Sequence, residues 1–317
     1  MKILITEVES LVRNNDISLE CFDTLADEVV LYSNITRDEL LKEIADTDIV
    51  LCNKALIDRE VILASRQLKY IGTFATGYNN IDLVTAKENG IRVCNAAGYS
   101  TNGVVQQVIG YILLHYTKIT QYNEFVQSGG WCKANIFSPL QFESEEVCGK
   151  TLGIVGYGTI GKAVAKVAKA LGMKVLAYTR TVKVDEDVTF TDFDSLLSLS
   201  DVVSLHCPLN EGTANLMNEE SFSKMKDGAF FINTSRGGTV VEEALAKALK
   251  SGKLSGAAVD VLRQEPMSED CPLKGIDNLI ITSHSAWSAL STRRRLVLQV
   301  YDNLKAFLEG NPQNVIL

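Results

Sequence analysis

Six residues near the middle of the chain restrict its fold more than any other feature. They read Gly156-Tyr157-Gly158-Thr159-Ile160-Gly161, a G-x-G-x-x-G pattern that follows an apolar run at residues 151–155 and opens a helical pattern at residues 159–171. Another apolar run follows at residues 174–178. This order predicts a β-α-β unit whose first glycine makes a tight turn and whose last lets helix and strand pack closely.

The same pattern predicts an anion site. The backbone of the second glycine can approach a pyrophosphate group, which would lie on the N-terminus of the helix. We therefore expect a dinucleotide there, bound by the fingerprint residues Gly156, Gly158, Thr159, Ile160 and Gly161. The alternative is a glycine-rich turn that binds no ligand.

Apolar runs and helical patterns alternate along most of the 317 residues. The first series has strands at residues 2–5, 29–32, 48–52, 70–73 and 91–94, and the second at 151–156, 174–178, 201–206, 229–234, 256–261 and 279–283. Continuous apolar runs are typical of parallel strands buried on both faces. We predict an α/β fold with two domains: residues 1–96 plus 288–317, and residues 97–287.

Smaller features refine this prediction. Capping boxes are predicted at Thr36-Arg37-Asp38-Glu39 and Thr239-Val240-Val241-Glu242. The segment 121–149 is interpreted as an irregular excursion, and residues 288–308 as a last helix that returns to the first domain. The run Arg293-Arg294-Arg295 is interpreted as a solvated face.

The composition of the chain limits its possible binding partners and its cellular compartment. The chain has 39 acidic and 31 basic residues, a net charge of −8, which argues against nucleic acid. Seven cysteines without a C-x-x-C pair indicate reduced thiols and no metal site. The acidic start MKILITEVES is unlike a signal peptide, and no stretch is apolar enough to cross a bilayer, so we expect a cytoplasmic protein.

The end of the second strand bears on which dinucleotide binds. Enzymes that use NAD place an acid there, about 20 residues beyond the fingerprint, to hold the ribose hydroxyls. This chain has Thr179 followed by Arg180, with Lys183 nearby. An arginine could pair with a 2′-phosphate, which favours NADP(H). The alternative is that Arg180 is a solvated loop residue and NAD(H) binds.

Three polar residues each follow a strand of the second domain, where parallel sheets bind ligands. They are Arg236, Glu265 and His284. Reduction of a carbonyl acid needs a cation for the carboxylate, an acid for the alkoxide, and a group that tunes that acid. Arginine, histidine and glutamate suit these roles in that order. The other two histidines, His115 and His206, have no such glutamate and are interpreted as structural.

Several motifs in one order resemble the D-isomer-specific 2-hydroxyacid dehydrogenases over nearly the whole chain. They are ATGYNNID at residues 75–82, GKTLGIVGYGTIG at 149–161, HCPLNEGT at 206–213, INTSRGG at 232–238, AAVDVLRQEP at 257–266 and TSHSAW at 282–287. The resemblance implies two Rossmann-like or flavodoxin-like domains with parallel sheets and an active site in the cleft between them. It also leads us to expect a homodimer.

The resemblance assigns roles to matching positions. Arg236 would bind the 2-oxo acid, His284 would be the acid/base and Glu265 would hydrogen-bond it. Thr76 and Gly77 would offer backbone donors to the substrate carboxylate. Positions matching residues that line the cofactor are Cys207, Pro208, Thr213, Thr234 and Asp260.

The resemblance is strongest to the glycerate dehydrogenase and hydroxypyruvate reductase branch, which implies NAD(P)-dependent reduction of hydroxypyruvate or glyoxylate to a D-2-hydroxy acid by hydride transfer. Departures are Ser283 and Ser285 beside the histidine, and Gln106-Gln107 where Ala-Glu is common. Three alternatives stay open: a dinucleotide-sensing corepressor of the same fold, a dehydrogenase for another 2-oxo acid, and a formate- or phosphite-type oxidant, the formate type being disfavoured by Glu265.

Overall fold

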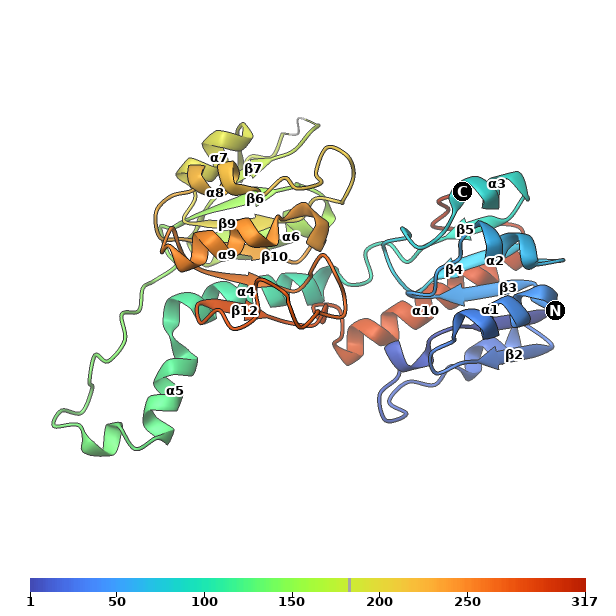
Figure 1. The fold of residues 1–317 in the computed structure, drawn as a ribbon, viewed down its shortest axis with the longest axis horizontal. Helices are drawn as coiled ribbons and strands as arrows, with labels where there is room; N and C mark the ends of the chain where they lie inside the picture. Colours follow the sequence, from blue (N-terminus) through green and yellow to red (C-terminus); the bar gives the residue numbers. More distant parts are fainter. Residues whose placement is uncertain (182–183) are drawn as a thin grey trace. The chain divides into compact units, whose positions relative to one another are not determined.

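The computed structural model describes residues 1–181 and 184–317. The chain divides into two compact units (Figure 1). The first unit consists of Met1–Ser100 and Ser288–Leu317, and the second unit of Thr101–Trp287. The last helix of the chain therefore packs with the N-terminal sheet.

The first unit has a five-stranded sheet in the order β2-β1-β3-β4-β5, and every pairing in it is parallel. This 2-1-3-4-5 order is the flavodoxin-like doubly wound arrangement. β3 and β4 are buried along their whole length, as expected for strands covered by helices on both faces. The strands are β1 (Lys2–Ile5), β2 (Glu28–Leu31), β3 (Ile49–Cys52), β4 (Tyr70–Thr73) and β5 (Arg92–Cys94).

Short helices connect these strands. They are α1 (Arg37–Glu43), α2 (Arg59–Ala64) and α3 (Leu83–Glu88), with single turns at Val8–Ser10, Glu20–Thr24 and Ile44–Asp46. The capping box predicted at Thr36 is confirmed: its side chain accepts from the Glu39 amide, and the Glu39 carboxylate accepts from the Thr36 amide. The long helix α10 (Leu290–Leu308) completes the unit.

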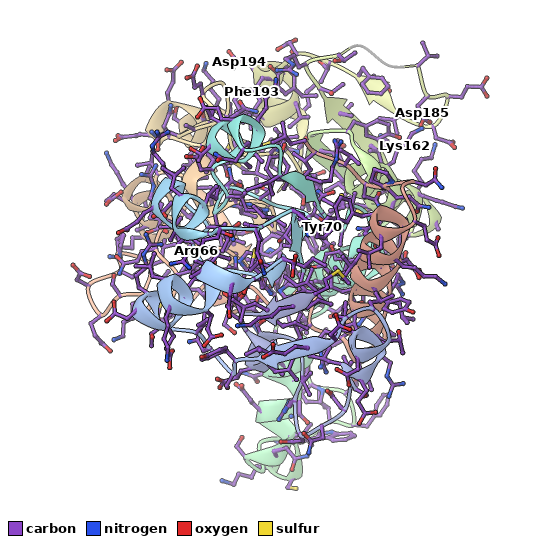
Figure 2. The ribbon with its side chains drawn as sticks, turned by 90° about the vertical axis from the view of Figure 1, so that its right-hand side faces the viewer. Arg66, Tyr70, Lys162, Asp185, Phe193 and Asp194 are labelled. Atoms are coloured by element: carbon purple, nitrogen blue, oxygen red, sulfur yellow. The ribbon has the colours of Figure 1, made fainter. Side chains whose placement is uncertain are left out.

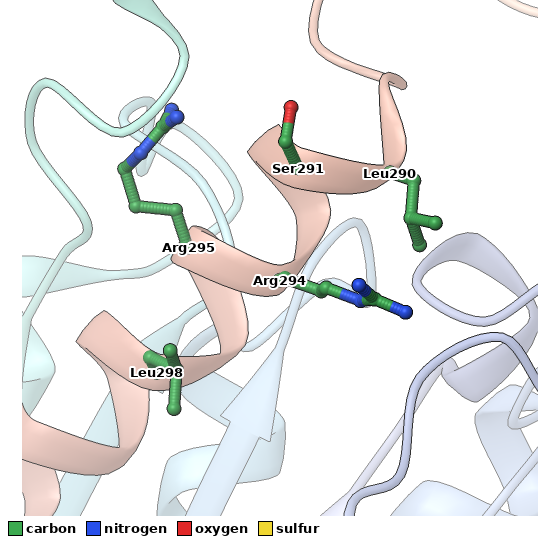
Figure 3. Close-up of a pocket in the computed structure, with 5 residues that line it drawn as sticks. All are labelled: Leu290, Ser291, Arg294, Arg295 and Leu298. Carbon is green, nitrogen blue, oxygen red and sulfur yellow. The ribbon is translucent and has the colours of Figure 1, made fainter.

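The arginine run at the start of α10 is not simply a solvated face. Arg293 is buried, donates to the carbonyl of Leu11 and pairs with Asp16, whose pKa it lowers to about 2. The interpretation failed because spacing alone does not show which face of a helix packs. Figure 3 shows Arg294 and Arg295 on α10, where they line a surface hollow of about 700 Å³.

The second unit has a seven-stranded, fully parallel sheet in the order β12-β11-β10-β9-β6-β7-β8. Six of its strands correspond to the predicted second series. The short edge strand β8 was not predicted. The strands are β6 (Thr151–Val155), β7 (Lys174–Tyr178), β8 (Thr189–Phe190), β9 (Val202–Leu205), β10 (Ala229–Asn233), β11 (Leu254–Val259) and β12 (Leu279–Ile281). The order reverses between β6 and β9, which is the topological switch point of a Rossmann-like sheet.

Helices pack on both sides of this sheet (Figure 1). They are α4 (Thr101–Thr117), α6 (Thr159–Ala170), α7 (Phe193–Leu199), α8 (Glu219–Lys224) and α9 (Glu242–Lys250), with a single turn at Gly237–Thr239. The predicted capping box before α9 is wrong. Thr239 donates to the carbonyl of Arg236, and Glu242 accepts from the amide of Arg263, so both side chains serve the neighbouring loops.

The predicted irregular excursion is wrong at its beginning. Helix α5 (Ile119–Gln127) continues the chain after α4, and a single turn follows at Trp131–Lys133. The sequence 134–150 then has no regular structure. In the described part of the chain, no helix is long and apolar enough to cross a membrane.

Candidate active site

The glycine fingerprint lies at the switch point of the second sheet. Gly156 has a φ of +99°, and a Cβ on it would come within 2.7 Å of the amide nitrogen of Cys207, beyond β9. A Cβ on Gly161 would lie 2.3 Å from the carbonyl oxygen of Gly156. The backbone therefore comes too close to itself at both positions for any larger residue.

Gly158 gives the loop its open side. It caps the N-terminus of α6 without a side-chain hydrogen bond, and a Cβ on it would meet no atom within 4 Å. Thr159 is exposed and Ile160 is partly buried. The space beside Gly158, at the N-terminus of α6, is therefore open, so an anion can approach the backbone there. These residues fit a dinucleotide pyrophosphate.

Thr179 and Arg180 follow β7 directly beside this loop, since the amide of Gly156 donates to the carbonyl of Tyr178. Arg180 is exposed and makes no ion pair with any residue in the described ranges. Lys183, named above as an extra charge, lies outside the described residues.

Asp185 is a neighbour of the fingerprint that the sequence did not indicate. Its carboxylate accepts from the hydroxyl of Tyr157 at 2.8 Å and lies 3.7 Å from the Lys162 ammonium (Figure 2). The Tyr157 bond lowers the pKa of Asp185. Asp185 thus fixes the side chain of Tyr157, the residue between the first two glycines of the pattern.

Beyond β9, the loop of the HCPLNEGT motif is held by its own side chains. The Thr213 hydroxyl donates to the carbonyl of Pro208 and accepts from the amide of Asn210. Burial raises the pKa of the Cys207 thiol, which keeps it protonated and unreactive. Cys207 lies next to Gly156 at the switch point, since a Cβ on Gly156 would come within 2.7 Å of the Cys207 amide nitrogen.

Both remaining histidines are structural neighbours of the sheet. Burial lowers the pKa of His206 to about 4, and its Nε2 lies 2.9 Å from the Ser204 hydroxyl. His115 stacks on Phe230 with ring centres 4.1 Å apart, and burial lowers its pKa to about 4 as well. Both shifts favour the neutral imidazole, and within the described residues neither ring makes an ion pair with a carboxylate.

Arg236 lies in the loop after β10, which a buried asparagine shapes. The Asn233 carboxamide accepts from the amide of Ser235 and donates to the carbonyl of Arg236. Thr234, between them, has a buried hydroxyl without a hydrogen-bond partner among the described residues. A buried donor of this kind fits a site that a ligand completes.

Close backbone contact joins this loop to the one that carries Glu265. A Cβ on Gly237 would lie 1.9 Å from the carbonyl carbon of Leu262, so only glycine fits there. Arg263 adds a side-chain hydrogen bond to the carbonyl of Val240. The loops after β10 and β11 therefore form one layer at the carboxyl edge of the sheet.

Glu265 and His284 are hydrogen-bonded. The carboxylate Oε2 lies 2.8 Å from Nδ1 of the imidazole, and Oε1 accepts from the amide of Leu262. Because an ionised carboxylate only accepts, Nδ1 carries the proton. The ring's Nε2 has no hydrogen-bond partner elsewhere in the described chain, and the His284 side chain is 26% exposed. The pair thus presents Nε2 for proton transfer.

Asp260 holds the backbone on which the histidine stands. Its carboxylate, which is almost fully buried, accepts from the amides of Ser285 and Ala286 at 2.8 and 3.0 Å. His284 itself has a φ of +52°, a strained conformation for a residue with a side chain. The hydrogen bonds from these two amides stabilise this conformation. Asp260 therefore has a local structural role in addition to any contact with a cofactor.

A hydroxyl chain extends this support into α4. The Thr282 hydroxyl donates to Asp260 and lies 2.5 Å from the hydroxyl of Tyr111, which accepts from Gln107 at 2.8 Å. Sequence reasoning noted Gln107 only as a departure from a family pattern. No local signal connects it with this chain, in which Tyr111 and Thr282 are 171 positions apart.

Thr76 and Gly77 lie in the first unit, after β4. The Thr76 hydroxyl donates to the carbonyl of Ala96, and its own carbonyl accepts from Asn95. The amides of Thr76 and Gly77 donate to no other residue that the structure describes. They are therefore available to an anion.

Comparison with known proteins agrees with this geometry. Residues 109–286 match the family described as D-isomer specific 2-hydroxyacid dehydrogenase, NAD binding domain. A hydroxypyruvate reductase of Blautia hydrogenotrophica is 40% identical over 295 residues, which are 91% of this chain and 92% of that protein.

Two solved structures share the fold and hold dinucleotides. An acyclic imino acid reductase in complex with NADPH and D-Arg is 30% identical, with a TM-score of 0.88 and full coverage of both chains. A D-lactate dehydrogenase from Aquifex aeolicus, complexed with NAD and lactic acid, is 30% identical, with a TM-score of 0.85 over 98% of this chain and 96% of that one. A nicotinamide dinucleotide is thus the cofactor class that the site accepts.

Proposed function

Because the chain belongs to the D-isomer specific 2-hydroxyacid dehydrogenases, we propose that it reduces a short 2-oxo acid to the D-2-hydroxy acid. The observation that carries this proposal is the 2.8 Å bond between Glu265 and His284, at the same sheet edge as Arg236. The favoured substrates are hydroxypyruvate and glyoxylate. The similarity to a hydroxypyruvate reductase supports the first of these.

Three side chains perform the proposed proton and charge chemistry. Arg236 holds the substrate carboxylate and polarises its carbonyl, for which a planar, permanently charged guanidinium is suited. His284 donates the Nε2 proton to the oxygen as it becomes an alkoxide. Glu265 stabilises the imidazolium form and keeps the proton of Nδ1 in place. The reduced nicotinamide, when bound, supplies the hydride for the carbonyl carbon.

The remaining predicted residues position substrate and cofactor. The amides of Thr76 and Gly77, which donate to no other described residue, bind the carboxylate. Residues 1–96 with 288–317 form the substrate-binding domain, and residues 97–287 the NAD(P)-binding domain. The cofactor contacts assigned to the latter are Gly156, Gly158, Thr159, Ile160, Gly161, Thr179, Arg180, Cys207, Pro208, Thr213, Thr234 and Asp260.

An assay of the purified protein tests the function. Oxidation of NADH and NADPH is followed with hydroxypyruvate, glyoxylate, pyruvate and 2-oxobutyrate. We expect turnover with the first two to exceed that with the others. Dinucleotide binding without turnover of any 2-oxo acid would instead support the corepressor-like alternative.

Cofactor choice is a separate proposal: NADP(H) is preferred over NAD(H). It is supported by the exposed Arg180, which makes no ion pair within the described residues and follows Thr179, where NAD enzymes carry an acid. A charge-assisted hydrogen bond contributes roughly 1.5–3 kcal/mol, and exposure reduces it toward the low end. We expect kcat/KM to be about tenfold higher with NADPH at low salt.

The double variant Thr179→Asp with Arg180→Ala tests this preference. Its acid should repel the 2′-phosphate and bind the ribose hydroxyls, so NADH should become the better cofactor. Lys174→Ala, an exposed lysine at the other end of β7, is the matched control for the loss of a charge. A wild-type preference for NADH at low salt would contradict the proposal.

Assembly and location are proposed on two further observations. A homodimer is supported by the exposed apolar side chains of Trp131, Ile136, Phe137 and Leu140, which lie on one segment after α5. A cytoplasmic location is supported by the seven free cysteines.

A further inference from the structure

Asp260 holds three consecutive backbone amides around the assigned proton donor. Its carbonyl accepts from the amide of His284 at 2.8 Å, and its carboxylate accepts from the amides of Ser285 and Ala286. His284 has its left-handed φ of +52° within this cradle. A residue with a side chain keeps such a conformation only where its surroundings fix it. The direction of the imidazole therefore depends on the position of the Asp260 carboxylate.

A chain of polar side chains holds that carboxylate from the side of α4, which passes β12 (Figure 1). Thr282, directly after β12, donates its hydroxyl proton to Asp260 Oδ1 at 2.5 Å. The Tyr111 hydroxyl lies 2.5 Å from the Thr282 hydroxyl, and the Gln107 carboxamide nitrogen lies 2.8 Å from the tyrosine oxygen. All four residues belong to the second unit.

The protons along this chain can point in one direction only. Thr282 has a single hydroxyl proton and gives it to Asp260, so the threonine oxygen must accept from Tyr111. The tyrosine uses its own single proton in that bond, so its oxygen must in turn accept from Gln107. Burial raises the pKa of the Tyr111 hydroxyl, which therefore keeps its proton. The side chain at position 107 thus has to be a donor.

Packing alone does not explain the tyrosine hydroxyl. Tyr111 is 3% exposed, and a phenylalanine would fill the same apolar space without a polar group to bury. A buried hydroxyl is costly unless it is hydrogen-bonded. Gln107 lies one helical turn before Tyr111 and so on the same face of α4. Both polar groups are therefore accounted for by the chain that ends on Asp260.

We propose that Gln107 and Tyr111 are positioning residues for the acid/base. Their one-way chain of hydrogen bonds, continued by Thr282, holds the Asp260 carboxylate and thereby orients His284. This inference rests on the proposed function, in which His284 protonates the alkoxide. A group at position 107 that only accepts would draw the Tyr111 proton toward itself. The tyrosine and threonine oxygens would then face each other without a proton between them, and the carboxylate would lose its support.

Gln107→Glu is the sharpest test, because it keeps the shape of glutamine but donates only while its carboxyl group is protonated. Its kcat for hydroxypyruvate, relative to the wild type, should fall with rising pH to a loss of about tenfold at about pH 8. The fall follows the ionisation of the new carboxyl, which partial burial and the charge of Asp260 shift above the ordinary pKa of about 4.3.

Gln107→Leu and Tyr111→Phe are the companion variants without a new charge. Each should lower kcat about threefold to tenfold at every pH, the effect of one hydrogen bond. KM for the 2-oxo acid should change less than about twofold in all three variants, because the groups assigned to its carboxylate lie outside this chain. Thr282→Ser keeps the hydroxyl and should retain most of the activity, whereas Thr282→Val should not.

Gln106→Glu is the matched control, since it puts the same charge on α4 at an exposed neighbour. The other charged groups around α4 are engaged elsewhere or exposed. His115 bonds to Ser255. On α6, which packs against α4, Lys162 and Lys169 pair with acids that follow β7, and Lys166 is exposed. A loss that follows pH should therefore be confined to position 107.

The ring signal of His284 gives a readout that needs no turnover. The chain has three histidines, so NMR of protein labelled in its histidines gives a simple spectrum, and His284→Ala identifies the signal. In Gln107→Glu, the difference of this signal from the wild type should grow with pH. In Gln107→Leu the difference should be the same at every pH.

Each outcome decides the proposal. Equal losses at every pH in Gln107→Glu and Gln107→Leu, or a loss in Gln106→Glu that follows pH, would overturn it. Unchanged kcat in Tyr111→Phe beside an active wild type would also overturn it and leave the proposed function intact. If Gln107→Glu does not fold, Tyr111→Phe and the two Thr282 variants decide. A wild-type protein that reduces no 2-oxo acid would contradict the proposed function itself, and the His284 signal would then decide the positioning role.

Discussion

Replacement of His284 by alanine should lower kcat for 2-oxo acid reduction by about 10²–10⁴-fold, the contribution of general acid catalysis. The imidazole is the group with a carboxylate on Nδ1 and an open Nε2, and no other histidine in the chain has this arrangement. Dinucleotide affinity should change little, because the ring is assigned to the substrate. Stopped-flow and steady-state kinetics with hydroxypyruvate, beside fluorescence titration of the dinucleotide, measure both effects.

Glu265→Gln is the companion variant for the same site. It keeps the shape and the acceptor but removes the charge that stabilises the imidazolium form. Reduction should therefore decline at a lower pH than in the wild type. A folded His284→Ala protein with near-normal kcat, or an unmoved pH–rate profile in Glu265→Gln, would remove the pair from the mechanism. His206→Ala serves as a control for the loss of an imidazole.

Arg236→Lys should reduce kcat/KM for the 2-oxo acid by about 10²-fold, although the positive charge remains. A lysine cannot form the planar, two-point contact with a carboxylate that guanidinium forms. The loss follows from one or two charge-assisted hydrogen bonds of about 1.5–3 kcal/mol each. Dinucleotide affinity should stay within about threefold of the wild type.

The neighbouring Arg263→Lys variant is a matched control, since that side chain donates to the carbonyl of Val240 and supports the loop. It should affect stability more than substrate binding. If dinucleotide binding collapsed in Arg236→Lys while KM for the substrate held, Arg236 would belong to the cofactor site instead.

The elements that the sequence predicted well are those with local causes. Continuous apolar runs such as Ile49–Cys52 and Ala229–Asn233 became buried parallel strands. The glycine fingerprint became a strand–turn–helix because Gly156 and Gly161 leave no space for a side chain. Both sheets have the doubly wound orders that such alternation predicts, so the α/β fold class is confirmed.

The elements that were missed depend on distant contacts. β8 has only two residues, too few for a pattern. Thr239 and Glu242 have the spacing of a capping box, but the carbonyl of Arg236 and the amide of Arg263 compete successfully for their side chains. The buried carboxylates of Glu7 and Asp260 accept hydrogen bonds from backbone amides that are distant in sequence. The donor to Glu7 is Asn53, 46 positions away, and the donor to Asp260 is Ala286, 26 positions away. No periodicity in the sequence records such bonds.

The configuration of the product tests the central claim most directly. Wild-type protein is incubated with hydroxypyruvate and NADPH, and the glycerate formed is resolved on a chiral column. The family to which the chain belongs predicts D-glycerate in nearly pure form, with its formation abolished in His284→Ala. L-glycerate, a racemic product, or no glycerate from the wild-type protein would contradict the account.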